Sequence, residues 1–349
     1  MALQYDAPSS RVDFQAALTA NPTLSTATQD AITAILGNSE TVAVGSFDGT
    51  NLVAPSNVQV VVADIAGNAG DQVTVTLPAD AMASASAWVF NSDADLTVAF
   101  NTVERVIASG NGNDTITVAG DKDTVLDGAN GNDTLQTSGG NDSVTGGAGD
   151  DSISTGAGND TIVSGEGNDT IDAGTGFDVV KIAGAASDYE FSVVDGQVVA
   201  AAKDGSATVT AINAEVFSFN DNENIMVTAN ETNANAMRLY QGLFDRSADV
   251  EGAQYWLDLL DNGTLTLKQV AEYFLISPEF QTQGEQSNDE FVEMLYNNAL
   301  NRASDAEGKE FWVGALDAGL DHSTVLIGFV GSAGAAVEID NVLIVPGLV

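Results

Sequence analysis

The spacing of hydrophobic and polar residues changes along this chain and divides it into regions. In residues 1–40 the apolar positions have helical spacing. Thr26 and Gln29 are spaced as a capping box before Ile32, and Gly37 is a stop signal. We therefore expect short helices over residues 1–40.

From residue 41 to residue 108 the pattern changes to that of β-strands. Three β-branched, mostly alternating segments, 58–62, 73–77 and 96–100, are separated by Gly, Asn, Asp and Pro. The sequence predicts a β-rich region over 41–108 that leads into the repeat following it.

Residues 109–181 repeat a unit of nine residues that is rich in glycine and aspartate. The clearest copies are GGAGDDSIS (146–154), TGAGNDTIV (155–163) and SGEGNDTID (164–172). An aspartate returns every nine residues, and an aliphatic residue follows two positions later. Such a repeat of one turn and one short strand predicts a stacked coil. A disordered linker has a similar composition, but it would not keep an aliphatic residue at every ninth position.

Two repeats would make one coil, which stacks Asp142 over Asp160 and Asp151 over Asp169. The aliphatic residues would point into a narrow core, and the glycines would take turn conformations that a β-carbon disfavours. Stacked carboxylates repel one another, so a cation is expected between them. Carboxylate and carbonyl oxygens suit Ca²⁺ better than Mg²⁺ or a transition metal.

The candidate calcium-binding residues are the aspartates and turn glycines of the regular repeats: Asp133, Gly140, Asp142, Gly147, Gly149, Asp151, Gly156, Gly158, Asp160, Gly165, Gly167, Asp169, Gly174, Gly176 and Asp178. The pattern is less regular before Asp133, because Asp121 stands where a glycine belongs and one extra residue separates Asp123 from Asp133. These irregular turns add four further candidates: Gly110, Gly112, Asp114 and Asp123.

Residues 109–181 resemble the RTX (repeats-in-toxin, hemolysin-type) family, whose β-roll binds calcium in these turns. The resemblance implies several bound Ca²⁺ ions and secretion by the type I pathway through an uncleaved C-terminal signal. The tail 335–349 ends in VEIDNVLIVPGLV, which is similar to such signals. Because calcium binding contributes folding free energy, we expect an unfolded chain in the calcium-poor cytosol and a folded one outside.

Residues 182–229 are expected to form a β-hairpin and strand that cap the roll. Segments 189–194 and 197–201 flank Asp195-Gly196, a hairpin turn signal, and 216–219 is one further strand.

Helical periodicity takes over at residue 230, and the region 230–334 is duplicated. RLYQGLFDRSADVEGAQYW (238–256) realigns with MLYNNALNRASDAEGKEFW (294–312). We expect two copies of one helical unit, packed on each other. Asp249 and Asp305 are expected as helix N-caps.

The segment 233–334 resembles a domain of unknown function that accompanies RTX repeats and occurs in bacterial S-layer and other surface proteins. Arg246 and Arg302 are expected to tie loops to nearby carboxylates, with contact to an anionic polysaccharide as the alternative. The repeated aromatic residues are expected in the core, with a platform for a sugar ring as the alternative: Tyr240, Trp256, Phe274, Tyr296, Trp312 and Phe329.

Composition narrows the function classes. The formal net charge of −40 at pH 7 argues against partners such as nucleic acid or acidic membranes. The absence of cysteine excludes disulfides and thiolate zinc sites, and one histidine excludes imidazole-rich metal sites. We see no cleaved N-terminal signal and no apolar run of the ~18 residues that a membrane span needs.

Enzymatic activity is not expected. An H-E-x-x-H metalloprotease needs two histidines, and the chain has no G-x-S-x-G motif. The one histidine, His322, follows Asp321 at an expected helix start, where a capping or exposed role is favoured. Paired carboxylates for glycoside cleavage stay open, since acidic residues are abundant.

The sequence thus predicts a mainly β protein with α-helices. A parallel β-roll (RTX solenoid) is flanked by an N-terminal helix and β region and by a C-terminal α-helical domain of two duplicated units. The predicted function is that of a secreted calcium-binding structural or cell-surface protein: an extracellular matrix, S-layer-like or filament component that self-assembles. The alternative is an adhesin or polysaccharide-binding module acting through 233–334, and an RTX-linked hydrolase is disfavoured.

Overall fold

The computed structural model describes residues 9–21, 24–55, 57–101 and 105–348. The described chain forms two compact units. Unit one comprises the residues up to 183 together with 187–214, and unit two comprises 184–186 and 215–348.

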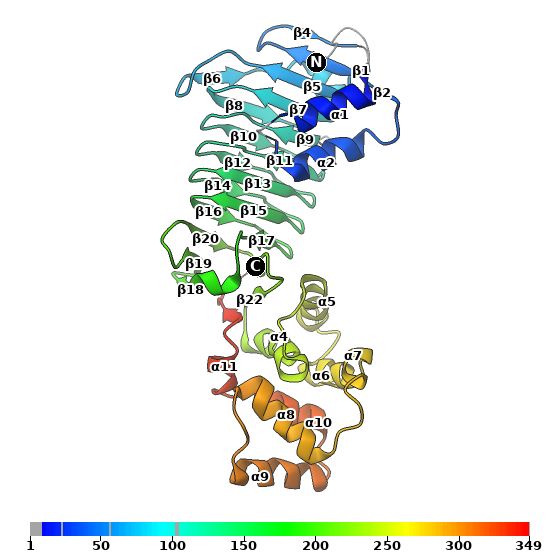
Figure 1. The fold of residues 1–349 in the computed structure, drawn as a ribbon, viewed down its shortest axis with the longest axis vertical. Coiled ribbons are helices and arrows are strands. Elements are labelled where there is room, and N and C mark those ends of the chain that lie inside the picture. The colour runs from blue at the N-terminus through cyan, green and yellow to red at the C-terminus, as the bar shows by residue number, and fades with distance from the viewer. Residues whose placement is uncertain (1–8, 22–23, 56, 102–104, 349) are drawn as a thin grey trace. The chain divides into compact units, whose positions relative to one another are not determined.

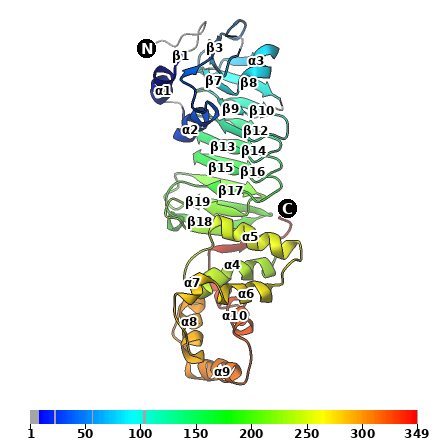
Figure 2. The same cartoon turned by 90° about the vertical axis from the view of Figure 1, so that its right-hand side faces the viewer.

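Unit one is a parallel β-solenoid of about seven turns, seen as stacked arrows in Figures 1 and 2. Its strands alternate along the chain between two sheets. Parallel strands of the first sheet are β6 (Gln72–Val75), β8 (Asp95–Phe100), β10 (Thr115–Val118), β12 (Thr134–Gln136), β14 (Ser152–Ser154) and β16 (Asn168–Asp172). Parallel strands of the second sheet are β3 (Val44–Phe47), β5 (Val60–Asp64), β7 (Ala87–Asn91), β9 (Arg105–Ala108), β11 (Thr124–Asp127), β13 (Ser143–Ala148), β15 (Thr161–Glu166) and β17 (Val179–Lys181).

The expected stacking of repeats is confirmed by the strand register. Val144 pairs with Ile162, and Ile153 pairs with Ile171, so each coil of the repeat region contains two nonapeptides. These aliphatic side chains are buried. One aliphatic residue per repeat therefore fills the core between the two sheets.

The β-rich region 41–108 is part of the same solenoid. Thr97 of β8 pairs in parallel with Thr115 of β10, so the sheet continues without a break into the repeats. Predicted strands 58–62, 73–77 and 96–100 correspond to β5, β6 and β8, whereas β3, β7 and β9 were not predicted. The short antiparallel β4 (Leu52–Val53) and the helix α3 (Ala79–Ser84) complete this region.

Two N-terminal helices, α1 (Arg11–Thr19) and α2 (Thr26–Ile35), lie beside the second sheet. Phe14 and Ile32 belong to a buried apolar cluster with residues of β3, β5, β7 and β9. The predicted capping box is wrong in register, because Ser25 caps α2 by accepting the Thr28 N–H. The expected helix end is confirmed, since Gly37 has φ 56° directly after the C-cap. Strands β1 (Ser9–Ser10) and β2 (Thr41–Val42) pair antiparallel beside these helices.

The predicted hairpin closes unit one. Strands β18 (Tyr189–Val194) and β19 (Gln197–Ala202) pair antiparallel around Asp195 and Gly196, both with positive φ. A third strand, β20 (Thr208–Ile212), pairs antiparallel with β19 and parallel with β16. A short 3₁₀ helix, Ala186–Asp188, precedes the hairpin.

Unit two contains the duplicated helices and three strands. The helices are α4 (Glu231–Phe244), α5 (Val250–Asp261), α6 (Leu267–Leu275), α7 (Pro278–Gln281), α8 (Asn288–Leu300), α9 (Ala306–Asp317), α10 (His322–Val330) and α11 (Ala335–Glu338). Strand β21 (Val216–Ser218) pairs antiparallel with β22 (Asn224–Thr228), and β23 (Val342–Ile344) pairs parallel with β22. The C-terminal tail therefore contributes a strand to unit two.

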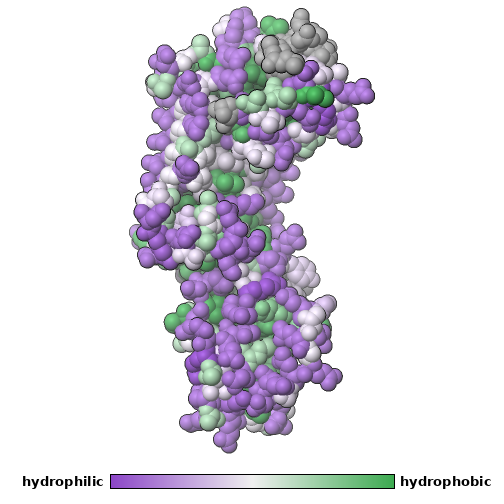
Figure 3. Space-filling view, in the orientation of Figure 1, coloured by the Kyte–Doolittle hydropathy of each residue, from purple (hydrophilic) through white to green (hydrophobic). Residues whose placement is uncertain are grey.

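The two helical copies pack on each other as expected, through α4 against α8 and α6 against α10. Asp249 and Asp305 are confirmed as N-caps of α5 and α9, where each accepts a glycine N–H three residues on. None of the described helices has the length and apolar character needed to cross a membrane. The face drawn in Figure 3 is mostly hydrophilic, with scattered hydrophobic residues.

Candidate metal centre

The turns of the solenoid form two rows, one leading into each sheet. The first turn row contains the turns that end at Asp114, Asp133, Asp151 and Asp169. The second turn row contains the turns that end at Thr124, Asp142, Asp160 and Asp178. Within a row, successive turns are stacked by parallel pairing of the strands that follow them.

A ladder of side-chain to main-chain hydrogen bonds runs along each row. The N–H of Asp133 donates to Oδ1 of Asp151, and the N–H of Asp151 donates to Oδ1 of Asp169. In the second row, the N–H of Asp142 donates to Oδ1 of Asp160. These donor–acceptor distances are 2.7–3.0 Å. Every aspartate of the regular repeats is thus held over its neighbour by one of its two carboxylate oxygens.

Five of these carboxylates have a second oxygen without a hydrogen-bond partner in the described chain. Buried Oδ2 atoms without a hydrogen-bond partner among the described residues belong to Asp133, Asp142, Asp151, Asp160 and Asp169. These side chains are at most 2 % exposed. Hydroxyls of Thr137 and Thr155 lie near the second row but donate to main-chain carbonyl oxygens. A buried anionic oxygen without a donor is costly, so each of these atoms fits a cation ligand.

Two glycines of the first turn row keep space open beside these oxygens. A β-carbon at Gly128 would collide with Oδ2 of Asp133 and with the carbonyl oxygen of Gly146. A β-carbon at Gly146 would collide with Oδ2 of Asp151 and with the carbonyl oxygen of Ser164. Free carboxylate and main-chain carbonyl oxygens therefore lie close together in each turn, and such oxygens are the donors that Ca²⁺ prefers.

Burial makes the cation-free carboxylates hard to ionise. Desolvation raises the pKa of Asp133 to about 8, and the neighbouring carboxylates of Asp114 and Asp151 add to the shift. Desolvation likewise raises the pKa of Asp169 and Asp178 to about 7 and that of Asp142 and Asp151 to about 6. A cation in the rows would hold these groups ionised at neutral pH.

The turn glycines predicted within the regular repeats have the conformations that the sequence suggested. Positive φ values are found at Gly140, Gly147, Gly149, Gly156, Gly158, Gly165, Gly167, Gly174 and Gly176. Ala129 occupies a glycine position with φ 68°. Gly110 and Gly112 lack positive φ values, but a β-carbon on either would collide with the main chain of the preceding coil.

Asp123 does not lie in register with the other aspartates. Its Oδ1 accepts the N–H of Asn141, while the N–H of Thr124 donates to Oδ1 of Asp142. Thr124 therefore holds the position that Asp142 and Asp160 hold in later coils, and Asp123 is exposed. The extra residue does not lie between Asp123 and Asp133, where the sequence pattern placed it. The register puts it earlier, in the turn between β10 and β11.

Among the residues that the structure describes, no three acidic or histidine side chains gather as a side-chain metal cluster. The rows have a different donor set, with one carboxylate per turn next to main-chain carbonyl oxygens. Sequence reasoning missed Gly128 and Gly146, which are the first residues of their turns. It also missed Ser164 in that same position, whose buried Oγ has no hydrogen-bond partner in the described chain.

The single histidine lies outside the turn rows. His322 begins α10 beside its N-cap Asp321, and its ring packs edge-on against Phe291 with centroids 4.7 Å apart. The expected position at a helix start is confirmed.

A parallel solenoid with stacked buried carboxylates and open glycine turns belongs to the class of cation-binding β-rolls. The comparison with protein families then makes the assignment specific. Residues 127–162 and 145–180 match the RTX calcium-binding nonapeptide repeat, and residues 227–283 and 271–338 match DUF4214, a domain of unknown function. No curated protein and no solved structure matches the chain.

The chain therefore contains an RTX β-roll, which is a calcium-binding module, followed by a DUF4214 helical region. Proteins with RTX repeats are typically secreted. The resemblance to the RTX family and the predicted fold class are both confirmed.

Proposed function

We propose that this protein is a secreted structural or cell-surface protein whose β-roll folds when it meets calcium outside the cell. The observation that carries the proposal is the pair of turn rows with buried carboxylate oxygens that have no donor in the described chain. The proposal includes no enzymatic activity.

The ligand set follows from the rows. Asp133, Asp151 and Asp169 in the first row, and Asp142, Asp160 and Asp178 in the second, would supply carboxylate oxygens. Turn carbonyls such as that of Gly146 would supply the rest. Bound Ca²⁺ supplies the positive charge that stacked carboxylates lack. Without it, repulsion and desolvation oppose folding of the roll.

Calcium titration followed by circular dichroism tests this proposal. Asp151→Asn keeps an acceptor for the N–H of Asp133 but removes the charge, so the calcium midpoint should rise on the order of tenfold. Asp150→Asn is the matched control. Asp150 is exposed, and its Oδ1 accepts the Asn168 N–H as an amide oxygen also can. An equal midpoint in wild type and Asp151→Asn would contradict the proposal.

The proposal also includes self-assembly of the folded protein. Strands β20, β19 and β18 continue the first sheet beyond β16, its last strand from the repeats. The edge of that last repeat is therefore already paired and is not available to another coil. The edge strand β18 remains, with Val193 and Val194 exposed. Light scattering at millimolar calcium should show assembly that Val193→Lys weakens. A chain that stays monomeric would remove self-assembly from the proposal.

Type I secretion through the segment 335–349 is also part of the proposal. Residues of this segment form α11 and β23 in the folded unit, with β23 paired to β22. The signal would therefore be recognised before unit two folds. Deletion of 340–349 should abolish export by a reconstituted type I system, and export without this segment would contradict the assignment.

A pocket in the first helical copy favours polysaccharide binding as a second candidate function. It has a volume of about 200 Å³, and its walls include Tyr240, Trp256, Tyr273 and Phe274. Tyr240 and Phe274 are buried as expected, whereas Trp256 is half-buried and Tyr273 is 50 % exposed. An exposed aromatic face beside polar groups can stack on the C–H face of a sugar ring.

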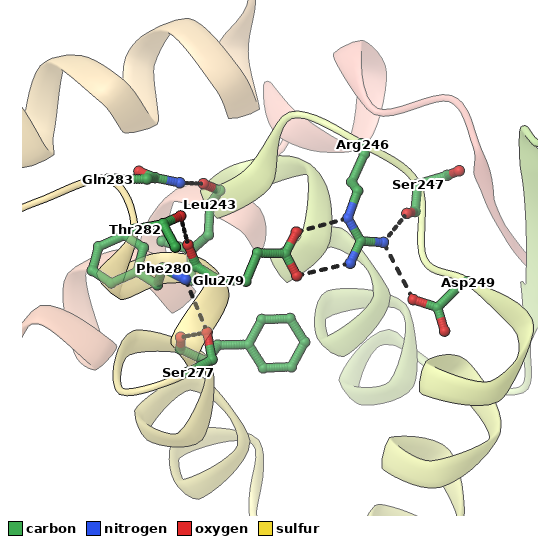
Figure 4. A network of polar contacts seen from close by, with 10 residues as sticks. Leu243, Arg246, Ser247, Asp249, Ser277, Glu279, Phe280, Thr282 and Gln283 are labelled. Atoms are coloured by element: carbon green, nitrogen blue, oxygen red, sulfur yellow. Dashed lines mark hydrogen bonds and ion pairs between the residues drawn. The ribbon is translucent and has the colours of Figure 1, made fainter.

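Polar groups line the same pocket, among them Arg246, Asp249 and Glu279. Figure 4 shows the hydrogen bonds and ion pairs that join them. Arg246 makes two hydrogen bonds of 2.9 and 3.0 Å to Glu279 and contacts Asp249 at 3.3 Å. Its guanidinium lies 4.9 Å from the ring centroid of Tyr240. The expectation that Arg246 ties its loop to carboxylates is therefore confirmed. Two carboxylates against one guanidinium favour a neutral sugar over an acidic one.

The second helical copy differs at this place. Arg302 likewise lies over Tyr296 and contacts Asp305. In the helix α10, however, Gly328 holds the position of Tyr273. The copies therefore share their framework, and the first one has the additional pocket wall.

Co-sedimentation of the full chain with neutral and acidic cell-surface polysaccharides tests this candidate. Tyr273→Ala should abolish binding, whereas Tyr255→Ala should retain it, because Tyr255 is exposed on α5 but does not line the pocket. Equal binding by both variants would return these aromatic residues to a packing role.

A further inference from the structure

The two turn rows change character at neighbouring coils of the solenoid. In the first row, Leu96 holds the aspartate position, because its N–H donates to Oδ1 of Asp114. In the second row, Arg105 pairs in register with Thr124, which in turn stacks over Asp142. In the later coils, five turns each have one half-bonded aspartate, meaning one whose Oδ1 accepts a main-chain N–H while its Oδ2 has no partner in the described chain. Toward the N-terminus, both rows lose this pattern.

Asp114 is the transitional residue of the first row. Its Oδ1 accepts the Leu96 N–H at 2.7 Å, and its Oδ2 accepts the Gly110 N–H at 3.1 Å. Both oxygens of this buried carboxylate are thus bonded to the main chain. In Asp133, one coil further on, Oδ2 has no such donor among the described residues. At Asp114 a main-chain N–H is bonded to Oδ2, whereas at Asp133 the corresponding oxygen is available to a cation.

The second row contains a cation of its own. The Arg105 side chain is 1 % exposed, donates to the carbonyl oxygen of Ala85 at 2.8 Å and lies over the Phe100 ring. Arg105 therefore holds the register position that aspartates hold in later coils, and its guanidinium is bonded to the main chain instead of facing a row of carboxylates. Thr124, between Arg105 and Asp142, is uncharged and buried.

The core changes between the same coils. Trp88 packs against Phe47, Phe90 and Phe100 with ring centroids 6.0–6.3 Å apart. The nonapeptide coils instead bury one aliphatic side chain per repeat. Because buried apolar area drives folding, the aromatic coils have the larger stabilisation from packing alone.

We infer that the coils over residues 44–118 fold without calcium and that calcium-dependent folding begins at Asp133 and Asp142. This inference rests on the proposed calcium-dependent folding of the repeats. The calcium-free coils would form a platform whose N–H group at Asp114 donates to Asp133 of the first calcium-binding turn. Thr124, in the strand that follows these coils, donates its N–H to Asp142 in the same way. Calcium scarcity alone would then not keep residues 44–118 unfolded before export.

Hydrogen exchange of the full chain, read by mass spectrometry in EGTA and in millimolar calcium, tests the inference. Peptides from 58–101 and 105–118 should be protected in both conditions. Peptides from 128–180 should be protected only in calcium. Their exchange should be at least tenfold slower in millimolar calcium than in EGTA.

The outcomes separate this inference from the proposed function. If the N-terminal coils exchange in EGTA as fast as 128–180, the inference is overturned and calcium-dependent folding stands. If 128–180 is already protected in EGTA, the proposed calcium-dependent folding is itself contradicted.

Two matched variants locate the boundary. Asp133→Asn should raise the calcium midpoint on the order of tenfold. Asp114→Asn should leave that midpoint within about twofold and instead speed exchange of 105–118 in EGTA, because one main-chain N–H loses its acceptor. A shift of the midpoint in Asp114→Asn as large as in Asp133→Asn would overturn the boundary.

Discussion

At the residue scale, the turns depend on backbone conformations and on space that glycine supplies. Gly147 has φ 117°, and a β-carbon there would collide with the carbonyl oxygen of Ala129 in the preceding coil. Ala129 holds the equivalent position with φ 68° and bears the steric cost of a left-handed conformation. The repeat thus tolerates one alanine where the other coils have glycine.

This exception leads to a stability prediction. Ala129→Gly should stabilise the calcium-saturated roll by about 1 kcal/mol, since glycine adopts positive φ without the β-carbon clash. Ala157→Gly, at an exposed turn position without positive φ, is the control and should not stabilise. Chemical denaturation in calcium measures both. A less stable Ala129→Gly would mean that the alanine conformation is not strained.

A second prediction concerns the duplicated helices. A β-carbon at Gly308 would collide with the hydroxyl of buried Tyr296, so Gly308→Ala should destabilise unit two by about 1–3 kcal/mol. Gly314 lies in the same helix with open space around its Cα, so Gly314→Ala should stabilise by about 0.5–1 kcal/mol through helix propensity. Thermal denaturation would compare the two. Equal effects would argue against the tight tyrosine–glycine contact.

At the scale of elements, Asp127 joins the N-terminal helices to the solenoid by hydrogen bonds. Buried Asp127, at the end of β11, accepts the Ser25 N–H and the Thr28 hydroxyl through Oδ2. Its Oδ1 accepts the Ala129 N–H. One carboxylate therefore joins the start of α2 to the turn that leads to Asp133.

Removing this carboxylate should loosen α2. In Asp127→Ala, two donors of α2 lose their acceptor, a cost of about 1–3 kcal/mol. We expect faster proteolysis within residues 11–36 in the presence of calcium. Asp30→Ala, at an exposed position of α2, is the control. Unchanged proteolysis in Asp127→Ala would show that the apolar contacts of Phe14 and Ile32 hold α2 without it.

The predictability of the elements depended on how regular their pattern is. The nonapeptides, the hairpin turn at Asp195-Gly196 and the duplicated helices were predicted because each follows a local rule. Strands β3, β7 and β9 were not predicted, because the coils there differ in length. Val60 pairs with Val44 in the coil before it and with Ala87 in the coil after it, and the second pair is much further apart in the sequence than the first. Coils of unequal length have no sequence period, so only the pairing reveals them.

At the scale of the whole molecule, the stacked carboxylates couple calcium, protons and folding. Burial raises the pKa of Asp133 to about 8 and of Asp169 to about 7, above the ordinary aspartate value of 3.8. Without calcium, the folded roll therefore binds more protons than the unfolded chain between about pH 4 and pH 8. Its stability falls as pH rises through that window.

The pH dependence of the calcium-free roll can be tested directly. In EGTA, lowering the pH from 8 toward 5 should increase the β-structure of the roll measured by circular dichroism. With calcium the dependence reverses, because the ligands must be ionised and acid weakens binding. Asp151→Asn, which cannot ionise at this site, should show a smaller change with pH. A calcium-free roll that loses β-structure on mild acidification would contradict this coupling.

The sequence by itself determined the repeat, its glycine turns, its aliphatic core, the oxygen donors for calcium and the duplication of the helices. These follow from residue type at fixed spacing, which is a local property. Tertiary structure alone decided where the row of half-bonded aspartates begins. Asp114 has the same residue type as Asp133, and Asp123 looks like another member of the series. Only the stacking of coils shows that Leu96 and Gly110 satisfy Asp114 and that Thr124, not Asp123, lies over Asp142. Hydrogen bonds between coils join residues about eighteen positions apart, and one extra residue in a turn changes which partners meet.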